Sequence, residues 1–370
     1  MSNNILKISK IWAYSSGLFL TQITWLSPVY LAFVLLFSLS IYVTMFNRRI
    51  KSDLVLILLC ILSLVQCYQF FLADVPRVIN LIVTYLSPII ICLTFRPEYF
   101  SSDFFKKYSI GYFSLFILDG VWRYYHPNVD IDIDKLNELG IGFQVYKFNS
   151  FMYLDSNFVG IQAVFTLSIY LWSCRFFNKR ASGLILFLGV IAIGLTFSRS
   201  ALFSLFICFF VYFSYGNIKR LLFCFILSIF LFVLIFSRIE SILSSDISFL
   251  SKFEIIRLAY DYILKFDFIS VLLGVGPGNA VNVLGIGAHN LIVSIVVETG
   301  IIGLVLFSLY MSYYILRLRW YSLLLIFPFL VSSMSLSTLA MPYFFTMLTV
   351  VLLLAKYKLY TDCQSNLSAN

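Results

Sequence analysis

Long runs of apolar residues without a charge alternate along the chain with short polar clusters. Residues 30–46 and 221–236 are two such runs, each close to the length that a helix needs to cross a bilayer. Cutting the chain at charges, prolines and polar clusters predicts about twelve spans, give or take two, of which the first and fifth are weak. They lie near 11–26, 28–46, 54–72, 77–95, 108–122, 156–174, 182–197, 200–215, 220–236, 289–316, 320–336 and 340–355.

The composition excludes a soluble globular protein. The chain is 61% apolar and 12% charged, with a mean hydropathy of +0.96, and one soluble core cannot hide so many apolar side chains. The net charge of +9 does not indicate nucleic-acid binding, because the basic residues form small groups between apolar runs. Since most cysteines fall inside apolar runs and no CxxC pair occurs, we expect neither disulfides nor a zinc site. The expected fold is an all-α polytopic membrane protein, and we expect no cleavable signal peptide.

Basic residues mark one side of the predicted membrane. Lys and Arg are retained on the cytoplasmic side of short loops, and 17 of the 26 fall on one side when the spans are followed in order. Most acidic residues fall on the other side, and both termini are therefore expected in the cytoplasm. The two long connections, near 123–155 and 237–288, then lie on the outer face, where long loops often carry function. Without internal repeats, residues 1–370 are treated as one transmembrane domain.

Arg199 is the first candidate for a functional site, at the outer junction of two short spans. A guanidinium at such a place is costly unless it meets an anion, water or a carboxylate. Its planar fork of donors suits bidentate recognition of a phosphate. Snorkelling to the interface, or pairing with an acid such as Asp155, is the alternative.

Arg257 is the second candidate. It lies in the segment 254–269, whose apolar residues recur at helical spacing. We expect an amphipathic helix along the membrane surface with Arg257 directed inward. A solvated charge on the polar face of that helix is the alternative.

His289 is the third candidate, immediately before the tenth predicted span. An imidazole titrates near neutrality and can accept or donate a proton during group transfer, although a histidine at a helix start also serves as a cap or interfacial residue. Glu298 lies nine residues further into the span. An acid inside a span is a functional candidate by default, because burying its charge is expensive.

Two further patterns are less specific for ligand binding. The glycines of the sequence GVGPG, Gly274, Gly276 and Gly278, superficially resemble a phosphate loop, but Pro277 and the lack of a following Lys favour a tight turn with exposed backbone amides that contact a ligand. The alternating acids of residues 130–134 (Asp130, Asp132 and Asp134) suggest a metal-binding DxD motif, yet a solvated strand or substrate rim is the simpler interpretation. We expect no metal site, and none at the isolated His126.

Taken in order, these residues resemble the bacterial O-antigen polymerase and O-antigen ligase superfamily. The resemblance covers roughly residues 195–310, and the first half matches only in hydropathy. It rests on an SR dipeptide at a span end, an Arg in an amphipathic stretch, a Gly-rich turn, and HN followed by E-x-G-x-x-G. Here these are Ser198-Arg199, Arg257, Gly274 to Gly278, His289-Asn290, and Glu298 with Gly300 and Gly303.

The resemblance implies a specific chemistry. It implies metal-independent, inverting glycosyl transfer without a cofactor, in a GT-C-like fold at the periplasmic face of the bacterial inner membrane. The donor would be an undecaprenyl-diphosphate-linked oligosaccharide. Arg199 and Arg257 would hold its diphosphate, His289 would deprotonate or position the acceptor hydroxyl, and the supporting residues would be Glu298, Asn290, Gly276 and Gly278. Membrane lipid and a chain-length regulator protein are the other expected partners.

Three activities remain open at this stage. The chain is short and its second outer loop is modest, which favours an O-antigen polymerase over a ligase that transfers glycan to lipid A core. A lipid-linked oligosaccharide flippase would also have about twelve spans. It would, however, place charged or broken helices near the midplane and show internal symmetry, neither of which is clear in this sequence.

Overall fold

The computed structural model describes residues 7–21, 27–46, 53–72, 75–128, 145–153, 155–217, 219–220, 222–223, 226, 247–335 and 341–368. Their regular structure is helical throughout these ranges, without a strand, which confirms the all-α expectation. Six helices in this part of the chain are long and apolar enough to cross a membrane, so the protein is a helical membrane protein. These candidate spans are Pro28–Met45, Leu54–Phe71, Val75–Thr94, Ser156–Phe176, Leu291–Leu318 and Pro342–Leu359.

The helices of the first half follow the predicted order with different lengths. The short α2 occupies the place of the weak first span, and the fifth span lies within a longer α6 whose charges fall mostly near its ends. The bounds are α2 Ile8–Ser15, α3 Pro28–Phe46, α4 Leu54–Leu62, η1 Ser63–Phe71, α5 Val75–Thr94, η2 Pro97–Tyr99 and α6 Ser102–Tyr125.

The second half contains the centre of the bundle and one end of it. Its bounds are α8 Ser156–Phe176, α9 Gly183–Gly194, α10 Arg199–Ser214, α12 Ile247–Lys265, α13 Phe268–Leu273, α14 Ala280–Leu284, α15 Leu291–Ser294, η4 Ile295–Thr299, α16 Gly300–Leu318, α17 Trp320–Leu325, α18 Phe327–Ser332, η5 Ser333–Ser335 and α19 Pro342–Ser368. Three of its apolar helices are shorter than a full span: Gly183–Gly194, Arg199–Ser214 and Trp320–Ser335. The predicted ninth span, 220–236, lies almost wholly outside the described residues.

Helix α8 lies at the centre of the bundle. Its span is 89% buried, against 22% for the span in α3, so α8 is enclosed by protein while α3 faces the surroundings. Helices α6, α9, α10, α17 and α18 pack around α8. An enclosed helix can carry polar side chains because its neighbours satisfy them, and Gln162 accordingly accepts a hydrogen bond from Tyr153 (2.7 Å) and donates one to the Gly17 carbonyl (3.1 Å).

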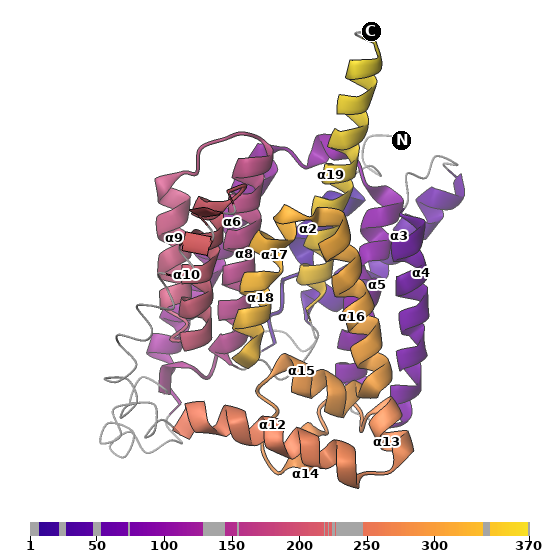
Figure 1. Cartoon of the computed structure of the whole chain (residues 1–370), viewed down its shortest axis with the longest axis vertical. Helices are drawn as coiled ribbons and strands as arrows, with labels where there is room; N and C mark the ends of the chain where they lie inside the picture. The colour runs from indigo at the N-terminus through magenta and orange to yellow at the C-terminus, as the bar shows by residue number, and fades with distance from the viewer. Residues whose placement is uncertain are drawn as a thin grey trace.

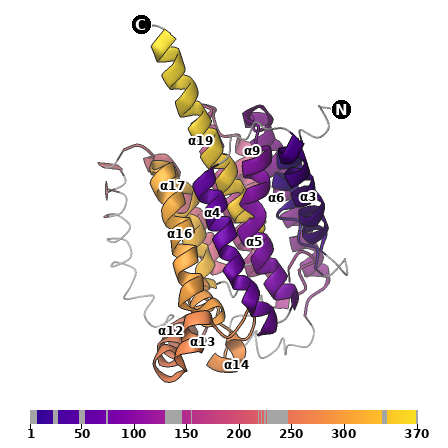
Figure 2. The same ribbon diagram turned by 90° about the vertical axis from the view of Figure 1, so that its right-hand side faces the viewer.

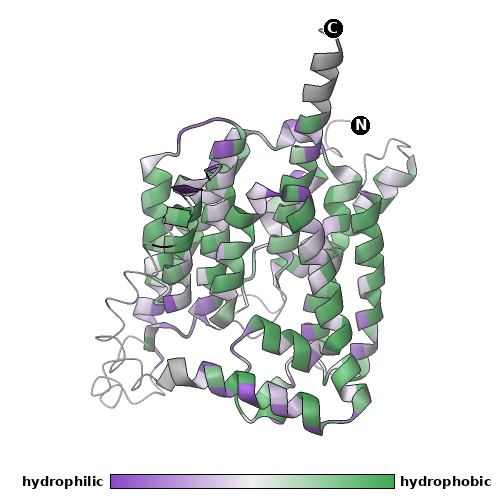
Figure 3. Ribbon diagram, in the orientation of Figure 1, coloured by the Kyte–Doolittle hydropathy of each residue, from purple (hydrophilic) through white to green (hydrophobic). Residues whose placement is uncertain are grey.

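Four helices form a platform across one end of the bundle. Figure 1 shows α12, α13, α14 and α15 at the end opposite the C-terminus of α19, with α12 crossing beneath the upright helices. Figure 2 places α13 below α16, beside the lower ends of α4 and α5. In Figure 3 the upright helices are largely hydrophobic, whereas α12 carries both hydrophobic and hydrophilic stretches. The platform has its own small apolar core, which includes Ile255, Ala259 and Tyr262 from α12 and Val293 and Val297 from the span above.

Candidate functional site

A glycine-rich turn at residues 274–278 connects α13 to α14 at the platform. Gly274, Gly276 and Gly278 have φ angles of 85°, 93° and 89°. L side chains rarely adopt such angles, so glycine is required by the backbone path. This confirms the expected tight turn.

The turn is hydrogen-bonded to the beginning of a membrane span. The Val275 amide donates to the Val297 carbonyl (2.9 Å) and the Gly276 amide donates to the Glu298 carbonyl (3.0 Å). Both acceptors lie in η4, a single π-helical turn between α15 and α16. Because a π-turn interrupts the regular bonding of an α-helix, backbone carbonyls become accessible to another segment. Two of the turn amides expected to contact a ligand are therefore already used within the protein.

Two glycines bring this turn and the span into direct backbone contact. A Cβ on Gly274 would overlap the Glu298 carbonyl and the Gly300 amide, and a Cβ on Gly300 would overlap the Leu272 carbonyl. Any larger residue would push α13 away from the span. The downstream E-x-G-x-x-G pattern thus begins with the acid and the glycine that receive the turn.

The Glu298 side chain is buried beneath the turn, with a relative exposure of 6%. The backbone N–H groups of Gly278 and Ala280 donate toward its carboxylate, and the positive charge of Arg77 lies close enough to act on it. Arg77 belongs to α5, and its guanidinium lies against Gly278, where a Cβ would overlap it. Three segments distant in sequence therefore meet at one carboxylate.

Sequence reasoning missed Arg77, because it stands at the first residue of the predicted fourth span and was treated only as its boundary. One signal was available. In the orientation predicted from the other basic residues, Arg77 falls on the outer side, where Lys and Arg are expected to be depleted. A basic residue against that bias is a reason to look for an anionic partner, which here is Glu298.

The C-terminal end of η1 holds the same turn from another direction. Gln69 Nε2 donates to the carbonyls of Leu273 and Glu298 (3.1 Å each), and the Tyr68 hydroxyl donates to the Leu273 carbonyl. Asn279 Nδ2 donates to the Leu72 carbonyl (2.8 Å). These bonds satisfy carbonyls at the end of α13, in η4 and after η1, so the turn is fixed by α4–η1 as well as by the span.

His289 and Asn290 occupy the entry to α15 in different ways. Asn290 is buried and caps the helix, because its Oδ1 accepts from the amides of Ile292 (3.0 Å) and Val293 (3.3 Å). The His289 ring is exposed and folds back over Gly287, so it does not cap the helix. Its accessible imidazole is placed to contact a molecule outside the protein.

Arg257 differs from the expected orientation. The buried face of α12 carries Ile255, Ala259 and Tyr262, whereas the Arg257 side chain is 75% exposed and lies 3.9 Å from Glu254. The expectation that Arg257 is directed inward is therefore wrong. The sequence period predicted the amphipathic helix correctly, but α12 buries a different face, because its small and aromatic residues at 259 and 262 pack on the platform core.

Arg199 is the first residue of α10 and is exposed. The preceding junction is fixed by a buried ion pair of α6, in which Arg123 Nε donates to Asp119 (2.8 Å) and Arg123 Nη2 donates to the Leu195 carbonyl (2.9 Å). Ser198 caps α10. Asp155, considered as a partner for Arg199, caps α8 by accepting from the Asn157 amide (2.8 Å).

Helix η5 connects the Arg199 and His289 regions. It contacts both α10 and α15. Asn290 Nδ2 approaches Met334 Sδ (3.7 Å), and Lys252 of α12 donates to Ser335 Oγ (3.4 Å). The structure therefore brings the start of α10, the start of α15 and one end of α12 to the same end of the bundle. Glu298 faces away from this group, toward Gly278 and Arg77.

In the described ranges no three His, Cys, Asp or Glu side chains are grouped so as to hold a metal ion. Asp130, Asp132 and Asp134 lie outside those ranges. His126 stacks on Trp122 with ring centroids 3.9 Å apart.

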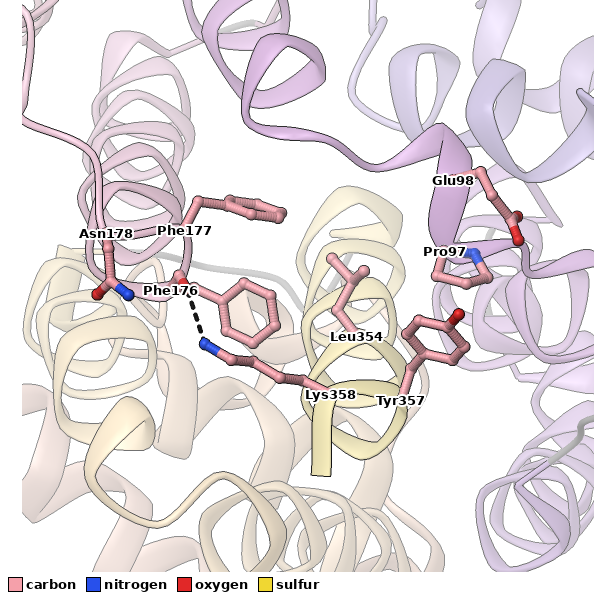
Figure 4. A pocket seen from close by; sticks show the side chains of 8 residues that line it. All are labelled: Pro97, Glu98, Phe176, Phe177, Asn178, Leu354, Tyr357 and Lys358. Carbon is pink, nitrogen blue, oxygen red and sulfur yellow. Dashed lines mark hydrogen bonds between the residues drawn. The ribbon is translucent and has the colours of Figure 1, made fainter. Parts of the chain in front are cut away.

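A separate cleft of about 450 Å³ opens at the opposite end of the bundle. Figure 4 shows it between α19 and the ends of α8 and η2, with Lys358 reaching the Phe176 carbonyl (3.2 Å) and Glu98 on the far side. It is lined by Lys358 of α19 and lies at the end opposite the platform. None of the residues singled out from the sequence lines it.

Comparison with protein-family models, with curated proteins and with solved structures gives no match.

Proposed function

We propose that the protein is an O-antigen polymerase, a glycosyltransferase that joins undecaprenyl-diphosphate-linked repeat units at the periplasmic face of the bacterial inner membrane. The observation that carries the proposal is the arrangement of one end of the bundle. An exposed histidine at the start of α15 lies at the same end of the bundle as the exposed Arg199 of α10 and Lys252 of α12. An exposed base beside cations suits transfer from an anionic leaving group.

In this mechanism His289 takes the proton of the acceptor hydroxyl as its oxygen attacks the anomeric carbon of the donor sugar. The bond from that carbon to the diphosphate oxygen breaks on the opposite face, so the configuration is inverted. Arg199 stabilises the departing diphosphate, whose charge grows in the transition state. Arg257 contributes only if the diphosphate reaches the outward face of α12, and Glu298 and Asn290 position the span that presents His289.

We further propose that the protein has about twelve spans in a GT-C-like arrangement, with both termini in the cytoplasm. The opposite placement of the platform and the basic residues of α19 supports that orientation. A chain-length regulator would be a partner in the membrane.

Replacing His289 with Ala tests the chemistry, and His126→Ala is the matched control because His126 is stacked on Trp122 in α6. We expect His289→Ala to abolish long surface polysaccharide while the protein stays in the membrane, and His126→Ala to leave chain length unchanged. Unchanged chain length in the His289 variant would refute its catalytic role.

A deletion strain separates polymerase from ligase. A single repeat unit on lipid A core indicates a missing polymerase, whereas long chains left on undecaprenyl diphosphate indicate a missing ligase. Repeat units trapped on the cytoplasmic face would indicate a flippase and would refute both transferase activities.

A further inference from the structure

An apolar groove of about 350 Å³ runs along the surface of the bundle between α4–η1 and α16. Leu62 and Val65 line one wall, and Ile301, Val305 and Leu309 line the other. All of its lining residues are aliphatic. Figure 2 shows α16 and α4 side by side, with α13 below them. The volume is in the range of clefts that hold small ligands, which is about 300–1,000 Å³.

The groove opens toward lipid rather than toward water. Its walls belong to the candidate spans Leu54–Phe71 and Leu291–Leu318. Val65 is 46% exposed and Val305 is 51% exposed. From residue 301 to residue 309 the helix rises by roughly 12 Å, so the groove follows the outer part of the span for about two turns. A hydrocarbon chain is the chemistry that fills an aliphatic groove at this depth.

The outer end of the groove is closed by Leu272 of α13, which is not part of a span. The glycine turn begins two residues later, and the Arg77 guanidinium lies against Gly278 at its far end. A molecule whose chain leaves the groove at Leu272 therefore reaches the glycine turn, with the exposed Arg77 at the far end of that turn. Apolar walls that lead to a cation match a single-chain lipid with an anionic head group.

We propose that this groove binds the polyisoprenyl chain of the lipid-linked substrate, with its diphosphate at the turn near Arg77. This assignment rests on the proposed function. Because the turn faces away from His289, this places the lipid chain of the acceptor on the α4–α16 surface, with Arg77 rather than Arg199 at its diphosphate. The sugars then extend from the turn along the platform, toward His289.

Photo-crosslinking tests the groove without requiring turnover. A photoreactive benzoylphenylalanine replaces Val305 in one variant and Leu316 in the other, and both proteins are placed in phosphatidylethanolamine nanodiscs with added undecaprenyl phosphate. Leu316 lies on the same helix, is 75% exposed, and does not line the groove, so it reports ordinary lipid contact. Mass spectrometry identifies the adducts after irradiation.

We expect polyisoprenyl adducts at position 305 and phospholipid adducts at position 316. Equal polyisoprenyl labelling at the two positions, or phospholipid alone at position 305, would overturn the groove assignment. In a second measurement Val305→Trp fills the groove, and we expect its affinity for undecaprenyl phosphate to fall about tenfold relative to Leu316→Trp. Equal affinity of the two Trp variants would also overturn it.

The same experiment separates this inference from the proposed function. If undecaprenyl phosphate binds the protein but the groove is not labelled, the groove assignment fails and the transferase proposal stands. If the wild-type protein binds no undecaprenyl phosphate at all, both fail. Arg77→Gln tests whether the phosphate end of the lipid lies at Arg77. We expect weaker binding of undecaprenyl phosphate, with no change in the position of the crosslink.

Discussion

The guanidinium of Arg77 lies directly against Gly278, so a residue of α5 covers the turn that docks on the span of α16. Behind this contact is the buried carboxylate of Glu298, toward which the turn directs its amides. The turn is therefore clamped between a cation on one helix and an anion on another. Substitution of Gly278 or Glu298 tests this clamp.

Gly278→Ala is expected to open the clamp. The new Cβ would overlap the Arg77 guanidinium, and the φ of 89° disfavours an L residue, so we expect a loss of about 1–3 kcal/mol in the free energy of unfolding. Thermal unfolding in detergent measures it. Gly111→Ala is the control, because a Cβ there meets nothing within 4 Å, and it should leave the unfolding temperature unchanged or raise it. Equal behaviour of the two variants would contradict the clamp.

Replacing Glu298 tests the hydrogen bonds that its carboxylate accepts from the turn. Glu298→Ala leaves the amides of Gly278 and Ala280 without their acceptor, which costs about 1–3 kcal/mol. Glu298→Gln keeps an acceptor oxygen and should cost less. Hydrogen exchange measures this directly: we expect residues 274–280 to exchange faster in the Ala variant than in the Gln variant, and faster in both than in the wild type. The reverse order would rule out a carboxylate that holds the turn.

The Asp119–Arg123 pair of α6 is expected to be the most sensitive polar pair among the described residues. Both side chains are at most 1% exposed, and Asp119 also accepts from Ser150 Oγ (2.6 Å). Arg123→Met leaves a buried carboxylate without its cation, so we expect destabilisation of about 3–5 kcal/mol. The double variant Asp119→Leu with Arg123→Met should be more stable than Arg123→Met alone. A double-mutant cycle with no coupling would show that the pair acts as two independent groups.

Acid stability should depend on Asp53, which lies just before α4. Burial raises the pKa of Asp53, but hydrogen bonds from Lys356 and Tyr313 (2.5 Å) outweigh it and hold the pKa below its ordinary value of 3.8. The carboxylate therefore contributes stability above that ordinary pKa, and the contribution is lost as the pH falls through the lowered pKa. We expect Asp53→Asn to flatten the decline in unfolding temperature below pH 4. An unchanged acid profile would exclude Asp53 as its source.

Helix α12 should lie in the membrane interface with a defined rotation. Its core residues pack on Val293 and Val297, which belong to the first turns of a span, so the helix sits at the membrane boundary. At about 100° per residue, Phe253, Ile256 and Tyr260 share one exposed stripe, and Arg257 lies at its edge beside Asp261. Spin labels at 253, 256 and 260 should be accessible to oxygen, and labels at 257 and 261 to a water-soluble nickel complex. Equal accessibility of all five labels to oxygen and to the nickel complex would contradict this rotation of α12.

Hydropathy predicted the membrane class and most of the upright helices, because an uncharged run of bilayer length has few other stable environments. It located α12 by its helical period. It did not indicate which face of α12 is buried, because the helix has two apolar stripes. Tyr262 lies on one of them and Arg257 lies at the edge of the other. The packing of the platform core determines which stripe is buried. The twelve-span count stays a prediction, since the ninth predicted span lies mostly beyond the described residues.

Some features of the site follow from the sequence and others do not. The positive φ angles of Gly274 and Gly278 follow from the sequence GVGPG, but the docking of this turn on a π-turn does not, because Val297 and Glu298 read as ordinary span residues. Arg77 was missed because its partners are far away in sequence. The catalytic and diphosphate-binding roles of His289, Arg199 and Arg257 stay predictions.

The enclosure of α8 has a consequence for how the chain is assembled. Its span has a mean hydropathy of 1.3, against 2.3 for Leu54–Phe71, and its buried Ser168 lies 3.3 Å from Cys208 of α10, a later helix. Helices α17 and α18, which pack on α8, emerge from the ribosome long after it does. A newly inserted α8 therefore exposes this surface, with the Ser168 hydroxyl, to lipid until its C-terminal neighbours arrive. The half-finished protein is the state in which the cell must protect this helix, and truncations before α17 should be degraded although every earlier span is intact.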